Sequence, residues 1–262
     1  MKQFVLSFNP ENPDNGSEKE FTLTDREFHY LIHVRRYTTG DSLPALSPDG
    51  RTFKMRVINI RKNTCSVGLT PVYGENSREN SPHPRITLMP ALTRGRKMDL
   101  VIRQAVESGA FAIWPVLSEN CQVKFQKDPD TSGKYERWNR IAVEALQQCG
   151  GKYSTTLETP ETMENILEMW DRRGPLFFLH EQNIGNKESK SLHQNLAETF
   201  EDLAIMVGPE GGFSHSETSL LREYGGKPVY LGERVLRAET AAIYGLAAIG
   251  TIIRESREWQ TA

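Results

Sequence analysis

Two short segments in the last third of the chain contain the residue types best suited to hold a small molecule and act on it. Residues 208–213 (Gly-Pro-Glu-Gly-Gly-Phe) end the apolar run 203–207, and residues 231–241 follow a second apolar run. Apolar runs of strand length that end at glycine bring backbone to a ligand at the carboxyl edge of an open α/β sheet. Gly211 and Gly212 lack a Cβ, so the chain can turn sharply there and approach a ligand closely. The two segments predict one pocket made largely of main-chain groups, which suits a nucleoside.

Three charged side chains stand among or beside these glycines. Arg237 carries a planar cation that can hold a carbonyl oxygen or a phosphate, or can form an ion pair with Glu210 or Glu239. Glu239 falls at the expected start of a helix, where the helix dipole favours a carboxylate, so it can brace that helix or act as a general base. Glu210 can bind a ribose hydroxyl or brace its own loop. His180, at the end of an earlier predicted strand, can handle a proton at neutral pH or have no role.

The elements that must position these residues alternate between strand and helix from residue 85 to the end of the chain, residue 262. Alternation at these lengths is typical of an α/β domain with a mainly parallel sheet. Strands are expected at residues 86–89, 112–116, 176–179, 203–207 and 228–231. Helices are expected at residues 96–108, 134–148, 191–200, 216–224 and 238–254.

Residues 1–73 have a different pattern, which predicts a small β-barrel with one helix. Partial alternation at 53–60, a turn, and a second apolar run at 64–69 predict paired strands. The helix is expected at 24–33, with Thr24 and Glu27 forming a capping box. Residues 74–84 are polar and contain many turn-forming residues (glycine, proline, asparagine and serine), so we interpret them as a linker between two domains.

Bulk composition indicates a globular protein of the cytoplasm. The 262 residues are 37% hydrophobic and 25% charged. The longest uncharged apolar run is 241–253, well short of the roughly 20 residues that cross a bilayer, and the N-terminus lacks the pattern of a signal peptide. Three widely separated cysteines favour neither a disulfide framework nor a metal site and fit a reducing compartment.

Charge is distributed unevenly although the net charge is only −2. Residues 1–73 carry a balance of +2 and residues 85–152 a balance of +4, whereas residues 153–262 carry −7. The excess positive charge in the N-terminal half could dock a phosphate backbone or could be ordinary solvated surface. The candidate RNA contacts are Arg35, Arg36, Arg94, Arg96 and Lys97.

Segments 208–213 and 231–241 together resemble the signature of the small-subunit ribosomal RNA uridine-N3 methyltransferases, which belong to the SPOUT class of S-adenosylmethionine (SAM) enzymes. Weaker matches at 29–41 and 96–109 extend the resemblance through both domains. It implies a PUA-like RNA-binding barrel followed by an α/β domain whose mainly parallel sheet is tied in a trefoil knot. It also implies SAM as cofactor, a homodimer, and methyl transfer to N3 of a uridine in small-subunit (16S) ribosomal RNA, within the assembled subunit.

The resemblance also implies a role for each segment. Residues 208–212 would hold the methyl donor on one wall, and Leu231, Gly232, Val235 and Leu236 would offer the adenine backbone hydrogen bonds and apolar contacts on the other. Arg237 would hold a uracil carbonyl or a flanking phosphate, with Glu239 as the second catalytic candidate. The cofactor-binding residues expected are Gly208, Pro209, Glu210, Gly211, Gly212, Leu231, Gly232, Val235 and Leu236; no metal site is expected.

Three positions depart from the family pattern and keep other hypotheses open. Asn120 stands where the family usually has arginine, and Gln147 and Gly151 replace a glutamate and an arginine. Roles carried over to these three positions are therefore in doubt. A non-catalytic RNA-binding or assembly factor on the same fold is one alternative. A dinucleotide oxidoreductase is another, although the usual Gly-x-Gly-x-x-Gly fingerprint is absent from the start of the α/β domain.

Overall fold

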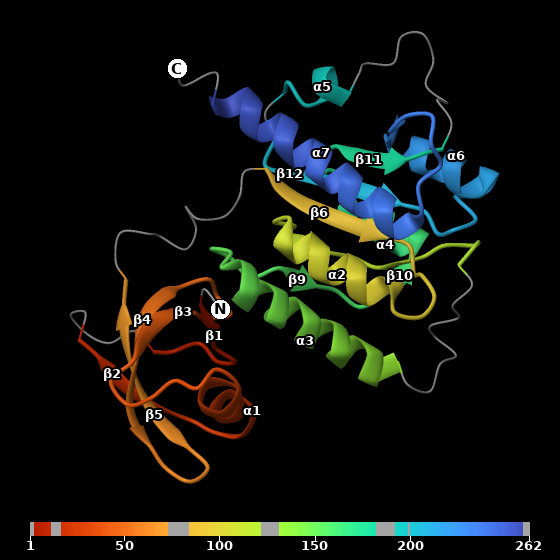
Figure 1. Ribbon diagram of the computed structural model, residues 1–262. Helices are drawn as coiled ribbons and strands as arrows, with labels where there is room; N and C mark the ends of the chain where they lie inside the picture. The colour runs from red at the N-terminus through yellow and green to blue at the C-terminus, as the bar shows by residue number, and fades with distance from the viewer. Residues whose placement is uncertain are drawn as a thin grey trace. The chain divides into compact units, whose positions relative to one another are not determined.

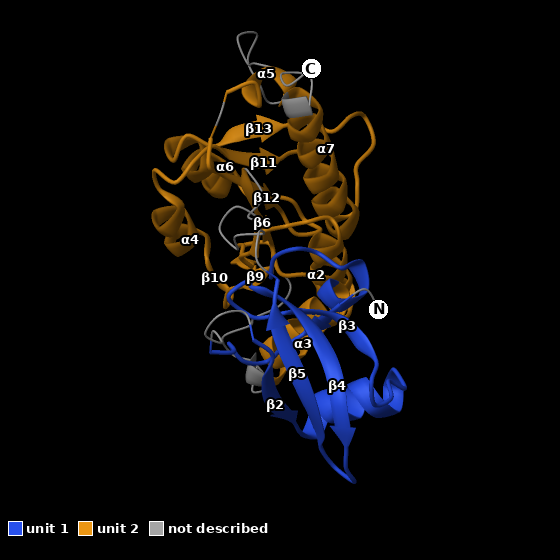
Figure 2. Ribbon diagram, turned by 90° about the vertical axis from the view of Figure 1, so that its left-hand side faces the viewer, with its two compact units in different colours: residues 1–81, 146–154 blue, residues 82–145, 155–262 orange. Residues whose placement is uncertain are grey.

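The computed structural model describes residues 3–11, 17–72, 84–121, 131–181, 192–198 and 200–258, and the statements below refer to these residues. The chain divides into two compact units, Met1–Ser81 with Leu146–Ser154, and Pro82–Ala145 with Thr155–Ala262 (Figure 2). Of the linker predicted at 74–84, only Pro84 lies within the described residues. Within the described part of the chain, no helix is long and apolar enough to cross a membrane.

The first unit is built on a five-stranded sheet with the order β1-β3-β4-β5-β2. Its central hairpin joins β4 (Thr52–Ile60) to β5 (Cys65–Pro71) in antiparallel register, which confirms the predicted pair. The remaining strands are β1 (Phe4–Val5), β2 (Lys19–Leu23) and β3 (Ser42–Leu46). Alternate residues of β4, among them Phe53, Met55 and Val57, face a buried core.

The predicted N-terminal helix exists, but its predicted capping box does not. The helix consists of α1 (Asp25–Phe28) and a π-helical continuation, η2 (His29–Val34). The Thr24 side chain makes no cap bond and instead donates to the carboxylate of Asp25 at 2.9 Å. Glu27 is engaged elsewhere, because its Oε1 accepts the backbone N–H of Ser7 at 2.9 Å. The contact with Ser7 thus occupies the Glu27 carboxylate that the capping box would have needed.

The second unit contains a six-stranded parallel sheet with the order β13-β11-β12-β6-β7-β9, and a short parallel pair, β10-β8. Strands of a parallel sheet are covered on both faces and read as continuous apolar runs, as the central strand β12 does. The strands are β6 (Arg85–Pro90), β7 (Ala112–Ile113), β8 (Val116–Leu117), β9 (Thr156–Leu157), β10 (Glu161–Thr162), β11 (Leu176–Leu179), β12 (Asp202–Val207) and β13 (Lys227–Val229).

Helices cover both faces of this sheet (Figure 1). On one face α7 (Ala238–Glu258) packs on β6 and β12 and against α2 (Lys97–Glu107). On the other face α4 (Met163–Trp170) and α6 (His215–Glu223) close an apolar core that contains Phe178 and Met206. The other helices are α3 (Thr131–Cys149) and the short α5 (Leu192–Asn195). This layering confirms the α/β class and the mainly parallel sheet.

Three details of the prediction are wrong. The strand expected at 112–116 is split into β7 and β8, because Pro115 between them cannot donate to a ladder. The helix expected at 191–200 is present only as Leu192–Asn195, with residues 191 and 199 outside the described residues. Helix α4 was not predicted, although Thr162 caps it by accepting the N–H of Asn165.

Candidate active site

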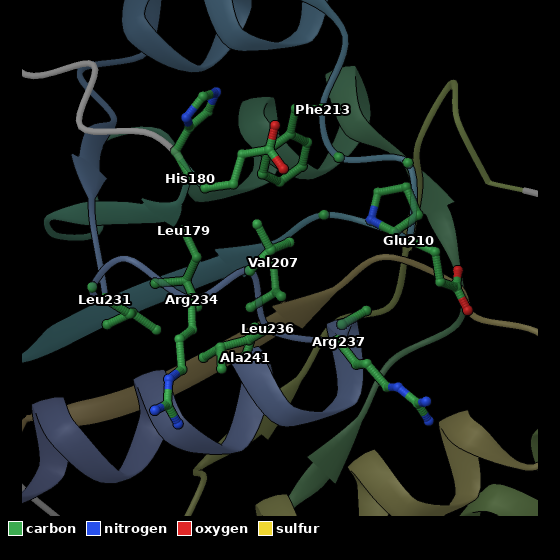
Figure 3. Close-up of a pocket in the computed structure, with 18 residues that line it drawn as sticks. Leu179, His180, Val207, Glu210, Phe213, Leu231, Arg234, Leu236, Arg237 and Ala241 are labelled. Atoms are coloured by element: carbon green, nitrogen blue, oxygen red, sulfur yellow. The ribbon is translucent and has the colours of Figure 1, made fainter.

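A pocket of about 320 Å³ lies where the parallel strands β11, β12 and β13 end (Figure 3). It is lined by the segments that leave those strands and by the first turn of α7. All nine residues predicted to hold a cofactor line it: Gly208, Pro209, Glu210, Gly211, Gly212, Leu231, Gly232, Val235 and Leu236. The carboxyl edge of a parallel sheet is the usual place for a ligand in an open α/β fold. Sequence positions about twenty residues apart are thus brought to one cavity.

The first wall turns sharply away from β12. The N–H of Gly212 donates to the carbonyl of Pro209 at 2.9 Å, and Gly212 has a φ of +69°, which favours glycine. The turn leads directly into α6, which begins with a capping box. Ser214 accepts the N–H of Glu217, and the Glu217 carboxylate accepts the N–H of Ser214 at 2.8 Å. The glycine turn therefore ends on a fixed helix terminus.

The second wall passes from β13 to α7. Gly232 again has a positive φ, +118°, which lets the chain reverse at the pocket edge. Leu236 faces the cavity, as do Val207 from β12 and Ala241 from α7 (Figure 3). The wall therefore combines exposed backbone with apolar side chains, the usual lining of a small-molecule site.

The segment after β8 packs against the outside of the first wall. Asn120 donates its side-chain amide to the carbonyl of Gly212 at 3.0 Å and to that of Gly211 at 3.4 Å. The N–H of Glu119 donates to the buried carboxylate of Glu217 at 2.9 Å. These contacts join two segments about ninety positions apart in the chain and fix the backbone of the glycine turn from behind.

A cluster of charges lies at one end of the pocket. Lys97, the first residue of α2, donates to Glu210 at 2.5 Å, and its Nζ lies 3.8 Å from Oε2 of Glu239. The hydrogen bond to Glu210 raises the pKa of Lys97. Burial acts to raise the pKa of Glu210, but the hydrogen bond from Lys97, a backbone hydrogen bond and the charges of Lys97 and Arg94 together outweigh it, and the net pKa is lowered. Lys97 and Glu210 are therefore both charged at neutral pH.

The two catalytic candidates occupy different environments. Arg237 lines the pocket and extends toward the same end as Glu210 (Figure 3). Glu239 is not among the lining residues; its side chain is only 12% exposed and faces Lys97. Oε2 of Glu239 is buried without a hydrogen-bond partner in the described part of the chain. The geometry thus presents Arg237 to a ligand and leaves Glu239 outside the pocket lining, facing Lys97.

Some pocket residues were outside the predicted set. Leu179, Val207, Phe213 and Arg234 line the pocket, and so does His180, which the sequence indicated as a proton-handling candidate but not as a cofactor contact. The strand-end rule that placed the two glycine segments also applies to β11, so the end of that strand supplied a usable signal for Leu179 and His180. No local pattern indicated the contacts of Lys97 or Asn120, because their partners are distant in sequence.

The predicted RNA contacts fall into separate groups. In the first unit Arg35 follows the π-helix, and the exposed Arg36 has a φ of +60°. In the second unit Arg94 and Arg96 are exposed just before α2. Arg96 lines a groove of about 350 Å³ with Arg103 of α2 and Arg137 of α3, whose guanidinium is paired with Asp99. Lys97 points instead into the charge cluster of the pocket.

Comparisons with known proteins agree with both units. Residues 79–250 match the family model of the RNA methyltransferase domain, and residues 23–70 match that of the RNA methyltransferase PUA domain. The ribosomal RNA small subunit methyltransferase E of Aquifex aeolicus is 33% identical over 213 residues, which cover 81% of this chain and 86% of that protein. The protein of the same name from Bacillus subtilis is 28% identical, with 87% and 89% covered.

A solved structure is similar over nearly the whole chain. A methyltransferase from Legionella pneumophila, determined with bound SAM, is 26% identical with a TM-score of 0.80 and covers 95% of this chain and 97% of its own. A PUA domain joined to this parallel-sheet domain defines an RNA methyltransferase by class. Within that class, the chain belongs to the family of the ribosomal RNA small subunit methyltransferases E.

Proposed function

We propose that this protein transfers a methyl group from SAM to N3 of a uridine in small-subunit (16S) ribosomal RNA, in the cytoplasm. The observation that supports this most strongly is the pocket itself. Two glycine-bearing loops, which leave the parallel strands β12 and β13 on either side of β11, enclose one cavity, and a planar cation, Arg237, stands at its edge. Family membership places RNA among the substrates, and the uridine N3 position follows from the resemblance of segments 208–213 and 231–241.

The described residues fit SAM. A nucleoside needs a flat apolar slot with backbone donors and acceptors, and the cavity offers Leu179, Val207 and Leu236 beside the exposed main chain of both loops. Glycine is favoured at two positions of the first wall: a Cβ on Gly211 would lie 3.3 Å from Asn120, closer than an ordinary contact, and the φ of +69° at Gly212 disfavours other residues. Close backbone approach is thus the property that this wall preserves.

The methyl transfer asks little covalent chemistry of the protein. Bound SAM supplies an electrophilic methyl group on its sulfonium. Neutral uracil N3 carries a proton, which must pass to a base or to water as the N3–methyl bond forms and the sulfur–methyl bond breaks. The protein must therefore hold N3 in line and stabilise the charge left on the flanking carbonyl oxygens. Arg237 is placed to hold one of those oxygens or the adjoining phosphate. Positioning of the two reactants supplies roughly 7–11 kcal/mol in favourable cases.

RNA contacts are proposed in both units. Arg35 and Arg36 would meet the backbone from the PUA domain, and Arg94 and Arg96 from the catalytic domain. The groove lined by Arg96, Arg103 and Arg137 extends that basic surface along α2. Such contacts position a phosphate backbone and do not read sequence. We propose the assembled small subunit as the substrate, which a comparison of free RNA with subunits would test.

The protein is proposed to act as a homodimer. Helix α7 carries no charged residue between Glu239 and Arg254, although part of this stretch is solvent-exposed. Tyr244 is 54% exposed, and Val235 just before the helix is 74% exposed. An uncharged, partly apolar helix face of this kind is suited to a second copy. Sedimentation equilibrium tests this: a dimer is expected, and Tyr244→Glu should shift it toward monomer.

The experiment that tests the function is methyl transfer from radiolabelled SAM to small ribosomal subunits that lack their own uridine-N3 methylation. Nucleoside analysis of the product should recover the label as 3-methyluridine. Label in another nucleoside would support RNA methyltransferase activity but exclude uridine N3 as the position that is methylated. No transfer, with SAM binding intact, would exclude this substrate.

A further inference from the structure

We propose that Lys97 is a positioning residue of the methyl-donor pocket, which ties the two pocket walls together through Glu210 and Glu239, and that it is not an RNA contact. This inference rests on the proposed function, since it assumes that the pocket holds SAM. This role replaces the RNA contact that the neighbouring basic residues at the start of α2 suggest for Lys97.

The geometry places Lys97 between the two walls. Its ammonium donates to Glu210 of the glycine loop at 2.5 Å and lies 3.8 Å from the carboxylate of Glu239, in the first turn of α7. The glycine loop is the first wall of the cavity, and the first turn of α7, which continues the second wall, lines it through Ala238 and Ala241. One cation on a third element, α2, therefore restrains both. The contact with Glu210 spans 113 positions of sequence.

Both carboxylates that Lys97 contacts are partly buried, which makes their pairing with a cation important. The side chain of Glu239 is 12% exposed and that of Glu210 is 29% exposed, so neither carboxylate is fully hydrated. Oε2 of Glu239 has no hydrogen-bond partner in the described part of the chain. A partly buried carboxylate is costly without a counter-charge, and Lys97 is the cation that the structure sets against it. Removing Lys97 would leave the carboxylates of Glu210 and Glu239 near each other without the positive charge that now lies between them.

The same geometry makes Lys97 a poor ligand for a phosphate. An RNA phosphate would have to displace the ammonium from Glu210 and would then lie near two carboxylates. The adjacent Arg96 differs in both respects. It is exposed, it lines the groove beside α3, and within the described residues it has no ion pair. Arg96 and Lys97 are therefore a matched pair: neighbouring cations with different partners.

The test compares Lys97→Met with Arg96→Met in two equilibrium titrations, one with SAM and one with a small-subunit RNA fragment without SAM. For K97M we expect the Kd for SAM to rise about 5–10-fold, the scale of a partly buried ion pair, with the RNA Kd within twofold of wild type. For R96M we expect the Kd for RNA to rise and the Kd for SAM to stay within twofold of wild type. Lys97→Arg, which keeps the charge, should recover most of the SAM affinity.

A double-mutant cycle with Glu210→Gln separates positioning from general loss of structure. If Lys97 acts through Glu210, the double variant K97M/E210Q should bind SAM no more weakly than the worse single variant. If K97M fails to fold, the same two Kd values are measured on K97R and E210Q instead. Unchanged SAM affinity in K97M, or a loss of RNA affinity larger than the loss of SAM affinity, would overturn the inference while leaving the proposed function intact. Wild-type protein that does not bind SAM would overturn both.

Discussion

The side-chain amide of Asn120 donates a hydrogen bond to the carbonyl of Gly212 at 3.0 Å. Asn120 is one of the positions where the family resemblance implies a departure from the usual pattern, and it lies directly behind the glycine turn. The Asn120 amide orients that carbonyl, and its side chain packs so close to Gly211 that a Cβ there would lie only 3.3 Å from it. The departure therefore falls at a position that supports the pocket wall.

Asn120→Asp should weaken SAM binding more than Asn120→Ala. The alanine variant only loses the donor, whereas aspartate keeps the shape and sets a carboxylate against two carbonyl oxygens. We expect a Kd for SAM about 3-fold higher for N120A and at least about 10-fold higher for N120D. Calorimetric titration measures both. Equal losses, or none, would show that the amide does not orient the loop.

Arg237→Ala should lower the rate of methyl transfer and leave the donor in place. The loss of one donor that stabilises developing charge costs about 10²–10³ in kcat, while the Kd for SAM should stay within about threefold. Arg254→Ala, at an exposed position further along α7, is the control for the loss of one cation. Single-turnover kinetics with saturating SAM give the rate. An unchanged rate in R237A would remove the residue from the mechanism.

Glu217→Gln should destabilise the protein although the residue touches no proposed ligand. The carboxylate is buried and accepts the N–H groups of Ser214 and Glu119. A glutamine would turn its own N–H₂ toward one of these donors, at a cost of about 1–3 kcal/mol in the free energy of unfolding. Urea denaturation measures this. Glu223→Gln, at an exposed position of the same helix, should change it by less than about 0.5 kcal/mol.

The contribution of the Lys97–Glu210 pair should not vary with pH across the neutral range. Because the pKa of Glu210 is lowered in the folded protein, the stabilisation that its charge contributes is present above the ordinary pKa of 4.5. This stabilisation is lost as pH falls through the lower native pKa. The raised pKa of Lys97 means that its contribution is present below 10.5 and is lost as pH rises beyond it. The ratio of SAM affinities of wild type and K97M should therefore be constant from about pH 6 to 9. A ratio that changed with a midpoint near neutrality would implicate another group.

Residue patterns predicted the parts of the site that depend on local chain geometry. An apolar run that ends at glycine is enough to place residues 208–213 and 231–236 at the carboxyl edge of a sheet, and the structure brings them into one pocket. The same reasoning missed α4, although Thr162 and the buried Met163, Ile166, Leu167 and Trp170 follow the helical period. The trefoil knot implied by the family resemblance stays a prediction.

Contacts between distant residues were beyond the reach of local patterns. Thr24 and Glu27 have the spacing of a capping box and do not form one, whereas Ser214 and Glu217 have the same spacing and do. The difference lies in Ser7, which occupies the Glu27 carboxylate from twenty positions away. Lys97 was expected among RNA contacts because its neighbours are basic, and only the folded chain brings it to Glu210.

The most direct test of the account is a crystal structure of the protein with SAM. We expect the adenosine between residues 208–212 and 231–236, and the methyl group on the side of the cavity open to Arg237. Lys97 should still contact Glu210 in that complex. SAM bound elsewhere, or a pocket that must open its glycine turn to admit the nucleoside, would contradict the account.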